Sequence, residues 1–132
     1  MKTDTAPGAA IGAVRRWLRA EGLAVLLLCL WLYLRGGHSW VLLLALFFLP
    51  DVAFIGYAAG PRVGANVYNA LHSYVGSVAA ALLALGTGRP AVVALIWAAH
   101  IGFDRFLGYG LKYPTAFVDT HLGRIGRRPG EA

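Results

Sequence analysis

Two aspartates and two histidines stand inside apolar stretches of the chain, where titratable side chains are rare. They are Asp51, His72, His100 and Asp104. An aspartate at the centre of a membrane span costs about 2.5 to 3.5 kcal/mol on insertion scales, so such groups must face one another or water. Carboxylates and imidazoles are also ligands of divalent metal ions, and two carboxylates would balance the charge of the ion. These four residues are therefore the candidate site.

The spacing of these residues agrees with a shared site. His100 and Asp104 are four positions apart, which places both on one face of a helix. His72 belongs to a polar stripe on the preceding apolar stretch, so polar neighbours surround it along the helix. We expect the candidate ligands to be oriented by hydrogen bonds from neighbouring side chains that do not themselves bind the metal. These neighbours are Tyr68, Asn69 and Ser73.

Several kinds of chemistry fit two carboxylates and two imidazoles. A single divalent metal ion is favoured, and the nitrogen and oxygen donors suit Zn, Mn or Fe(II). The chain has one cysteine, Cys29, which excludes an internal disulfide and a cysteine-based structural zinc site. A hydrogen-bonded network that joins helices and a proton or ion pathway remain open. Neither haem nor a nucleotide is expected, because haem would leave both acids beside an apolar macrocycle.

The elements that must carry these residues are predicted from composition. Of 132 residues, 58% are hydrophobic and only 14% are charged, too few charges to cover a water-soluble domain. A bilayer span needs about 20 apolar residues. We therefore predict an all-α polytopic membrane protein, a single membrane domain built as a four-transmembrane-helix bundle. The predicted helices are 17–34, 40–59, 63–88 and 91–111, with an N-terminal segment 1–16 and a tail 112–132.

The distribution of basic residues predicts the orientation. Four spans place both termini on one side, and ten of the twelve Lys and Arg residues lie on that side. The positive-inside rule therefore predicts cytoplasmic termini. The net charge of +6 then reflects membrane topology, and no nucleic-acid partner is expected. Membrane lipids are the expected partners, and a homo-oligomer remains open.

The predicted orientation also places the four candidate ligands at similar depths. At 1.5 Å rise per residue, Asp51, His72 and His100 lie about 12 to 13 Å from the cytoplasmic ends of their helices, and Asp104 about 7 Å. Three helices thus bring these groups to one layer in the cytoplasmic half of the bundle.

Four sequence segments resemble the bacterial inner-membrane family known as domain-of-unknown-function family 4260. The resemblance runs from about Leu18 to Gly123 and implies a multi-pass protein of the bacterial inner membrane, without implying an activity. The segments are Arg19-Ala20-Glu21-Gly22, Pro50-Asp51 with Gly56-Tyr57-x-x-Gly60-Pro61-Arg62-x-Gly64, Tyr68-Asn69-x-x-His72-Ser73-Tyr74, and His100-Ile101-Gly102-Phe103-Asp104-Arg105-x-x-Gly108-Tyr109-Gly110-Leu111-Lys112.

A weaker likeness links the chain to the membrane-bound metal-dependent hydrolases of the YdjM type. The matching segments are Pro50-Asp51, His72-Ser73 and His100-x-x-x-Asp104. The second acid of that family is replaced by Ala53, and Tyr68-Asn69 stands in the region of its His-Arg pair. The likeness implies a metal site with fewer ligands more than it implies a reaction.

If the protein is an enzyme, we expect a metal-activated water to attack an ester or phosphoester of a lipid or amphiphile. Glu21 is then a candidate base, and Arg62 or Lys112 a candidate partner for an anionic group, from their positions alone. Two other classes remain open. One is a small transporter or proton relay that uses the same residues without metal, and the other is a non-catalytic membrane scaffold.

Overall fold

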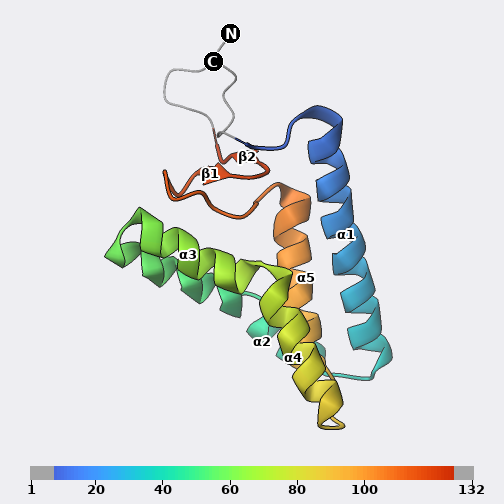
Figure 1. Ribbon diagram of the computed structural model, residues 1–132. Coiled ribbons are helices and arrows are strands. Elements are labelled where there is room, and N and C mark those ends of the chain that lie inside the picture. Colours follow the sequence, from blue (N-terminus) through green and yellow to red (C-terminus); the bar gives the residue numbers. More distant parts are fainter. Residues whose placement is uncertain (1–7, 127–132) are drawn as a thin grey trace.

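The computed structural model describes residues 8–126, and nearly all of its regular structure is helical (Figure 1). The predicted helical class is therefore confirmed. Lys2, Arg127 and Arg128, which the predicted orientation includes, lie outside the described residues. The elements are α1 (Gly12–Arg35), α2 (Trp40–Leu46), the 3-10 helix η1 (Leu49–Ala59), α3 (Pro61–His72), α4 (Tyr74–Gly86), α5 (Val92–Leu107), β1 (Asp119–Thr120) and β2 (Gly123–Arg124).

Two helical stretches in the described part of the chain are long and apolar enough to cross a membrane. They are α1 and the stretch Trp40–Ala59, and α3 with α4 forms a third if this bent pair is one span. Only 17% of the apolar window in α1 and 6% of that in Trp40–Ala59 is buried within the protein, as expected for surfaces that face lipid. α5 has 16 residues and is shorter than a typical span.

The helix predicted over 63–88 is two helices in the structure, α3 and α4, which differ in direction by 41°. Ser73 separates them with an extended backbone. Because no proline or glycine stands at this position, the sequence gives no sign of the break. In Figure 1, α3 lies across the direction of α1 and α5, and the turn between η1 and α3 lies to the side of these helices.

Side chains of α5 satisfy the backbone carbonyls that the break leaves without helical partners. The indole N–H of Trp97 donates to the carbonyl of Leu71 at 2.7 Å, and the guanidinium of Arg105 donates to the carbonyl of His72, also at 2.7 Å. Irregular backbone inside a membrane protein is tolerated only where neighbouring groups supply such partners. The break between α3 and α4 is therefore stabilised by hydrogen bonds from α5.

Replacing Arg105 with methionine is expected to lower the free energy of unfolding by about 3 kcal/mol. The substitution removes charge-assisted hydrogen bonds to the carbonyls of His72 and Tyr109, and it leaves the buried carbonyl of His72 unsatisfied. The measurement is unfolding in SDS followed by circular dichroism. Arg89→Met, at an exposed position between α4 and α5, should stay within about 0.5 kcal/mol of the wild type. Equal stability of the two variants would contradict this role for Arg105.

Two other predicted helices also differ from expectation. The stretch 40–59 changes from α-helix to 3-10 helix after Leu46, because Pro50 has no N–H to donate and its ring disfavours the regular α-helix before it. The helix predicted over 91–111 ends at Leu107, where Gly108 adopts the left-handed conformation (φ 95°) that closes many helices.

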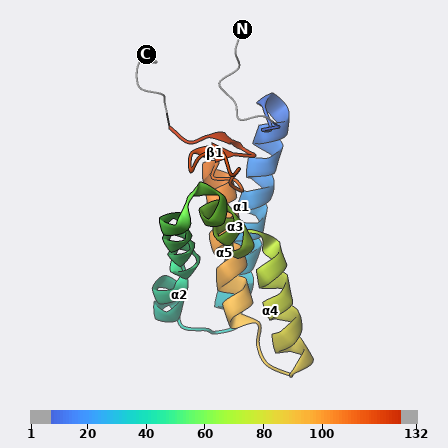
Figure 2. The same ribbon diagram turned by 60° about the vertical axis from the view of Figure 1, so that its left-hand side comes forward.

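The predicted polar tail is described as far as residue 126, and it lies over the end of α5 and beside the first turns of α1 (Figure 2). β1 and β2 form a short antiparallel hairpin in which Thr120 and Leu122 are completely buried. The backbone N–H of Ala10 donates to the carbonyl of His121 at 2.7 Å, and the Arg15 side chain bonds the carbonyl of Leu122. The first and last described residues therefore lie at the same end of the molecule.

α1 and α5 form the most extensive helix contact and lie side by side in both views. Gly22 and Gly102 occupy the contact, where the two backbones approach closely. His100 and Asp104 lie on the other side of α5, since a residue two positions along a helix is turned by about 200°. The contact with α1 thus supports the helix that carries half of the candidate ligands.

Candidate metal centre

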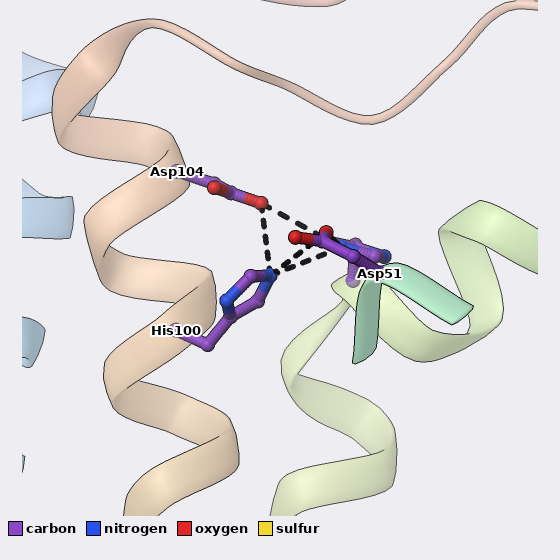
Figure 3. Close-up of side chains that lie close together, drawn as sticks. Asp51, His100 and Asp104 are labelled. Carbon is purple, nitrogen blue, oxygen red and sulfur yellow. Dashed lines mark hydrogen bonds and ion pairs between the residues drawn. The ribbon is translucent and has the colours of Figure 1, made fainter. Parts of the chain in front are cut away.

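The four candidate ligands converge from three elements. Asp51 comes from η1, His72 from the last residue of α3, and His100 and Asp104 from α5. One ligand atom from each residue lies within 4.8 Å of all the others. Figure 3 shows His100 and Asp104 directed from α5 towards Asp51 on the facing element.

Five of the six distances between the ligand atoms are close to those around a tetrahedral ion. The two Nε2 atoms of His72 and His100 are 3.2 Å apart. Asp51 Oδ1 lies 3.1 Å from Nε2 of His72 and 3.3 Å from Nε2 of His100, and Asp104 Oδ2 lies at 3.6 and 3.3 Å from the same atoms. Ligands bound at about 2.1 Å in a tetrahedron stand about 3.4 Å apart. The sixth pair, formed by the two carboxylates, lies within 4.8 Å, so the four side chains are close enough together to hold one small divalent ion.

Burial differs among the four ligands. His72 and His100 are inaccessible to solvent, and Asp104 is nearly so. The side chain of Asp51 is 31% exposed. A charged group in such surroundings is stable only with a partner of opposite charge. Solvent therefore reaches the cluster beside Asp51 and is excluded from the side formed by the two histidines.

Tyr68 holds the imidazole of His72 in one orientation. Nδ1 of His72 lies 2.9 Å from the carbonyl oxygen of Tyr68, which can only accept a hydrogen bond, so Nδ1 carries a proton. The tyrosine ring stacks on the imidazole with a centroid distance of 3.8 Å. In the neutral imidazole, Nε2 then presents a lone pair to the carboxylate oxygens. Because acceptors face one another there, a proton or a metal ion must lie between them.

The imidazole of His100 is positioned by packing. Phe47 and Phe48 contact it edge-on, with ring centroids 5.4 and 6.0 Å away. Its buried Nδ1 has no hydrogen-bond partner among residues 8–126. No sequence pattern pointed to these two phenylalanines as neighbours of the site, since they lie within a uniformly apolar run.

A cavity of about 320 Å³ lies beside the cluster. Both carboxylate ligands, Asp51 and Asp104, line it together with Lys112, and most of the remaining wall is aromatic or aliphatic. The other lining residues are Phe48, Phe54, Tyr68, Phe103, Leu107, Tyr109, Phe117 and Ile125. The cluster therefore borders a predominantly apolar space that contains one basic side chain.

Lys112 is held in this cavity wall by Asn69. The side-chain amide of Asn69 donates to the carbonyl of Lys112 at 2.8 Å and accepts from its N–H at 2.6 Å. The ammonium group donates to the carbonyl of Phe117 at 2.8 Å and lies 3.7 Å from the centre of that ring. Asn69, expected to orient a metal ligand, thus positions Lys112. Burial lowers the pKa of this ammonium to about 8, an effect that Asp104 partly opposes.

The other predicted groups lie away from the cluster. Glu21 borders a second cavity, of about 510 Å³, which it shares with Tyr74, Arg105 and His121. Arg62 is exposed in the first turn of α3 and lines neither of these two cavities. Ser73 directly follows the last residue of α3, and its backbone N–H donates to the carbonyl of Asn69. Of the three groups proposed for catalysis or anion binding, only Lys112 lies beside the candidate ligands.

Comparison with known proteins identifies one family. No match to this chain was found among curated proteins or among solved structures. The family model described as a domain of unknown function, DUF4260, matches residues 15–125, which includes all four candidate ligands. The chain therefore belongs to the DUF4260 family.

Proposed function

We propose that this membrane protein binds one divalent metal ion through Asp51, His72, His100 and Asp104. The observation that carries the proposal is the set of five ligand-atom distances between 3.1 and 3.6 Å, close to the edges of a coordination tetrahedron. The two carboxylates balance the charge of the ion, and the ion removes the cost of burying them.

The surroundings of His100 favour a metal ion over a proton relay. A relay across a membrane needs a continuous series of donors and acceptors on both sides of the cluster. Nδ1 of His100 has no such partner among the described residues, and two phenylalanines cover this ring. The fixed proton on Nδ1 of His72 likewise directs Nε2 towards the cluster, the arrangement usual for a metal-bound imidazole.

We further propose that the site hydrolyses an ester or phosphoester of an amphiphile. A bound divalent ion would polarise the ester group of a substrate and lower the pKa of a bound water molecule. Two nitrogen and two oxygen donors suit Zn, Mn or Fe(II). Asp51 is the most exposed ligand and lines the cavity, so a substrate oxygen would approach a bound ion on this side, and the Asp51 carboxylate would accept a proton from water. The aromatic walls suit the apolar part of a lipid.

The location that we infer is the bacterial inner membrane, with four spans and both termini in the cytoplasm. The hydrogen bond between Ala10 and His121 supports a common side for the two termini. Most Lys and Arg residues also belong to segments at or near that side in the sequence-based topology. In this arrangement the α3–α4 pair is a broken span, and α5 is a short span at the centre of the bundle.

The proposal is tested by elemental mass spectrometry of the purified protein in dodecyl maltoside. Separate samples are stripped with chelator, reloaded with Zn, Mn or Fe(II), and freed of excess metal by gel filtration. We expect about one ion per chain for at least one of these metals. Failure to retain any of them would overturn the proposal. Loaded protein is then assayed for hydrolysis of short-chain glycerol esters and phosphoesters, and a complete lack of turnover would overturn the hydrolase assignment while leaving the metal site intact.

A further inference from the structure

Lys112 is a buried cation without an anionic partner in the described part of the chain. It is only 5% exposed, and its ammonium contacts a carbonyl oxygen and two aromatic rings. No carboxylate among residues 8–126 forms an ion pair with it. A buried charge is ordinarily paired, so this lysine needs a partner that residues 8–126 do not provide.

The charge balance of the cavity indicates what that partner is. With a divalent ion bound as in the proposed function, on which this inference rests, the ion and the two carboxylates sum to zero. Lys112 then leaves the cavity with one uncompensated positive charge. A ligand with a single negative charge restores neutrality, because it places that charge between the ammonium group and the metal centre.

The walls of the cavity indicate the rest of the ligand. Phe48, Phe54 and Phe117 line the cavity and are also 60%, 41% and 42% exposed, so they connect it with the outer surface of the protein. Such rings contact hydrocarbon favourably and offer no hydrogen bonds to a second polar group. A small inorganic anion would leave these contacts unused.

We propose that the cavity between Lys112 and the Asp/His cluster binds the phosphodiester group of an anionic amphiphile. The two non-bridging oxygens of a phosphodiester share one negative charge and point in different directions. One therefore accepts a hydrogen bond from Lys112 while the other faces the metal centre. The hydrocarbon part lies along the phenylalanines at the mouth. Lys112 is thus the residue that selects anionic over neutral amphiphiles.

Titration of Lys112 leads to a pH-dependent prediction. The ionisable groups that line the same cavity are Asp51 from η1, Tyr68 from α3, Asp104 from α5 and Tyr109 beyond α5. Burial lowers the pKa of Lys112 to about 8 in the metal-free protein, so this side chain carries less positive charge at pH 9.5 than at pH 7. Affinity for the anionic amphiphile should therefore fall between these values in the wild type, as measured by calorimetry. The Lys112→Met variant should show no such fall, and an equal fall in both proteins would contradict the assignment.

The binding experiment uses calorimetry of metal-loaded protein in dodecyl maltoside with three probes. These are dihexanoylphosphatidylglycerol, which is an anionic phosphodiester, the neutral dihexanoylglycerol, and inorganic phosphate. We expect the phosphodiester lipid to bind at least about tenfold more tightly than either other probe, since a charge-assisted hydrogen bond and apolar contacts both contribute. Inorganic phosphate that binds as tightly as the lipid would overturn the assignment to an amphiphile.

Variants separate this inference from the metal site. Lys112→Met should abolish the preference for the anionic lipid, whereas Arg89→Met, at an exposed position, should retain it. Lys112→Gln provides a second neutral substitution if the methionine variant folds poorly. Both Lys112 variants should keep the wild-type metal content. If the Lys112 variants keep both their metal and the preference for the anionic lipid, the role of Lys112 is overturned and the metal site is not. If the wild-type protein binds no metal, the proposed function is overturned.

Discussion

Replacing His100 with glutamine should reduce the bound metal from about one ion per chain to less than about a tenth of that value. Nε2 of His100 lies 3.2 to 3.3 Å from one ligand atom of each of the other three residues, so no other member of the cluster is more central. The ring is completely buried, and no neighbouring imidazole among the described residues can replace it. Removing a ligand should weaken binding by about 100-fold or more, since even the groups that orient ligands contribute 10- to 100-fold. Elemental mass spectrometry after gel filtration measures the loss.

The control for this variant is His38→Gln. His38 lies between α1 and α2, and its ring packs against Tyr33 rather than against the cluster. This variant should retain the wild-type metal content, and His72→Gln should lose it as His100→Gln does. Circular dichroism establishes that each variant is folded. Full metal occupancy in folded His100→Gln protein would show that the ion binds elsewhere.

The convergence of the four candidate ligands could be predicted although the path of one helix could not. Straight parallel helices place His72 at the depth of Asp51 and His100, but α3 actually lies across the bundle. His72 is the last residue of α3, at the end beside α5. A change in the direction of α3 therefore displaces its distant end far more than it displaces His72. Arg62 lies at that distant end and does not line the cavity beside the cluster.

The role of the C-terminal segment could not be predicted for a different reason. Helices are read from the periodicity of apolar residues, and strands of two residues are too short to show any period. Asn69 and Lys112 are 43 positions apart in the chain, so only the folded structure brings them together. Trp97 is an exception that the sequence could have indicated. Its indole N–H stands inside an apolar helix and needs an acceptor, which the broken α3–α4 pair supplies.

Replacing Gly102 with alanine should lower the free energy of unfolding by about 3 kcal/mol or more. A Cβ atom at this position would lie 2.6 Å from the carbonyl oxygen of Gly22 and 2.8 Å from the backbone nitrogen of Leu26. Both are backbone atoms of α1, so the clash is relieved only if the two helices separate. Alanine is favoured over glycine in a helix by about 1 kcal/mol, which is smaller than the cost of separating α1 from α5. Unfolding in SDS, followed by circular dichroism, measures the difference.

Gly86→Ala is the matched control, because it makes the same substitution in the last turn of α4, where a Cβ atom would meet nothing within 4 Å. Its stability should equal or slightly exceed that of the wild type. The Gly102 variant should also bind metal less well, since a displaced α5 moves His100 and Asp104 relative to Asp51 and His72. These results would show that the close packing of α1 on one side of α5 keeps His100 and Asp104, on the other side of α5, close to Asp51 and His72. Two alanine variants of equal stability and equal metal content would contradict this coupling between the helix contact and the site.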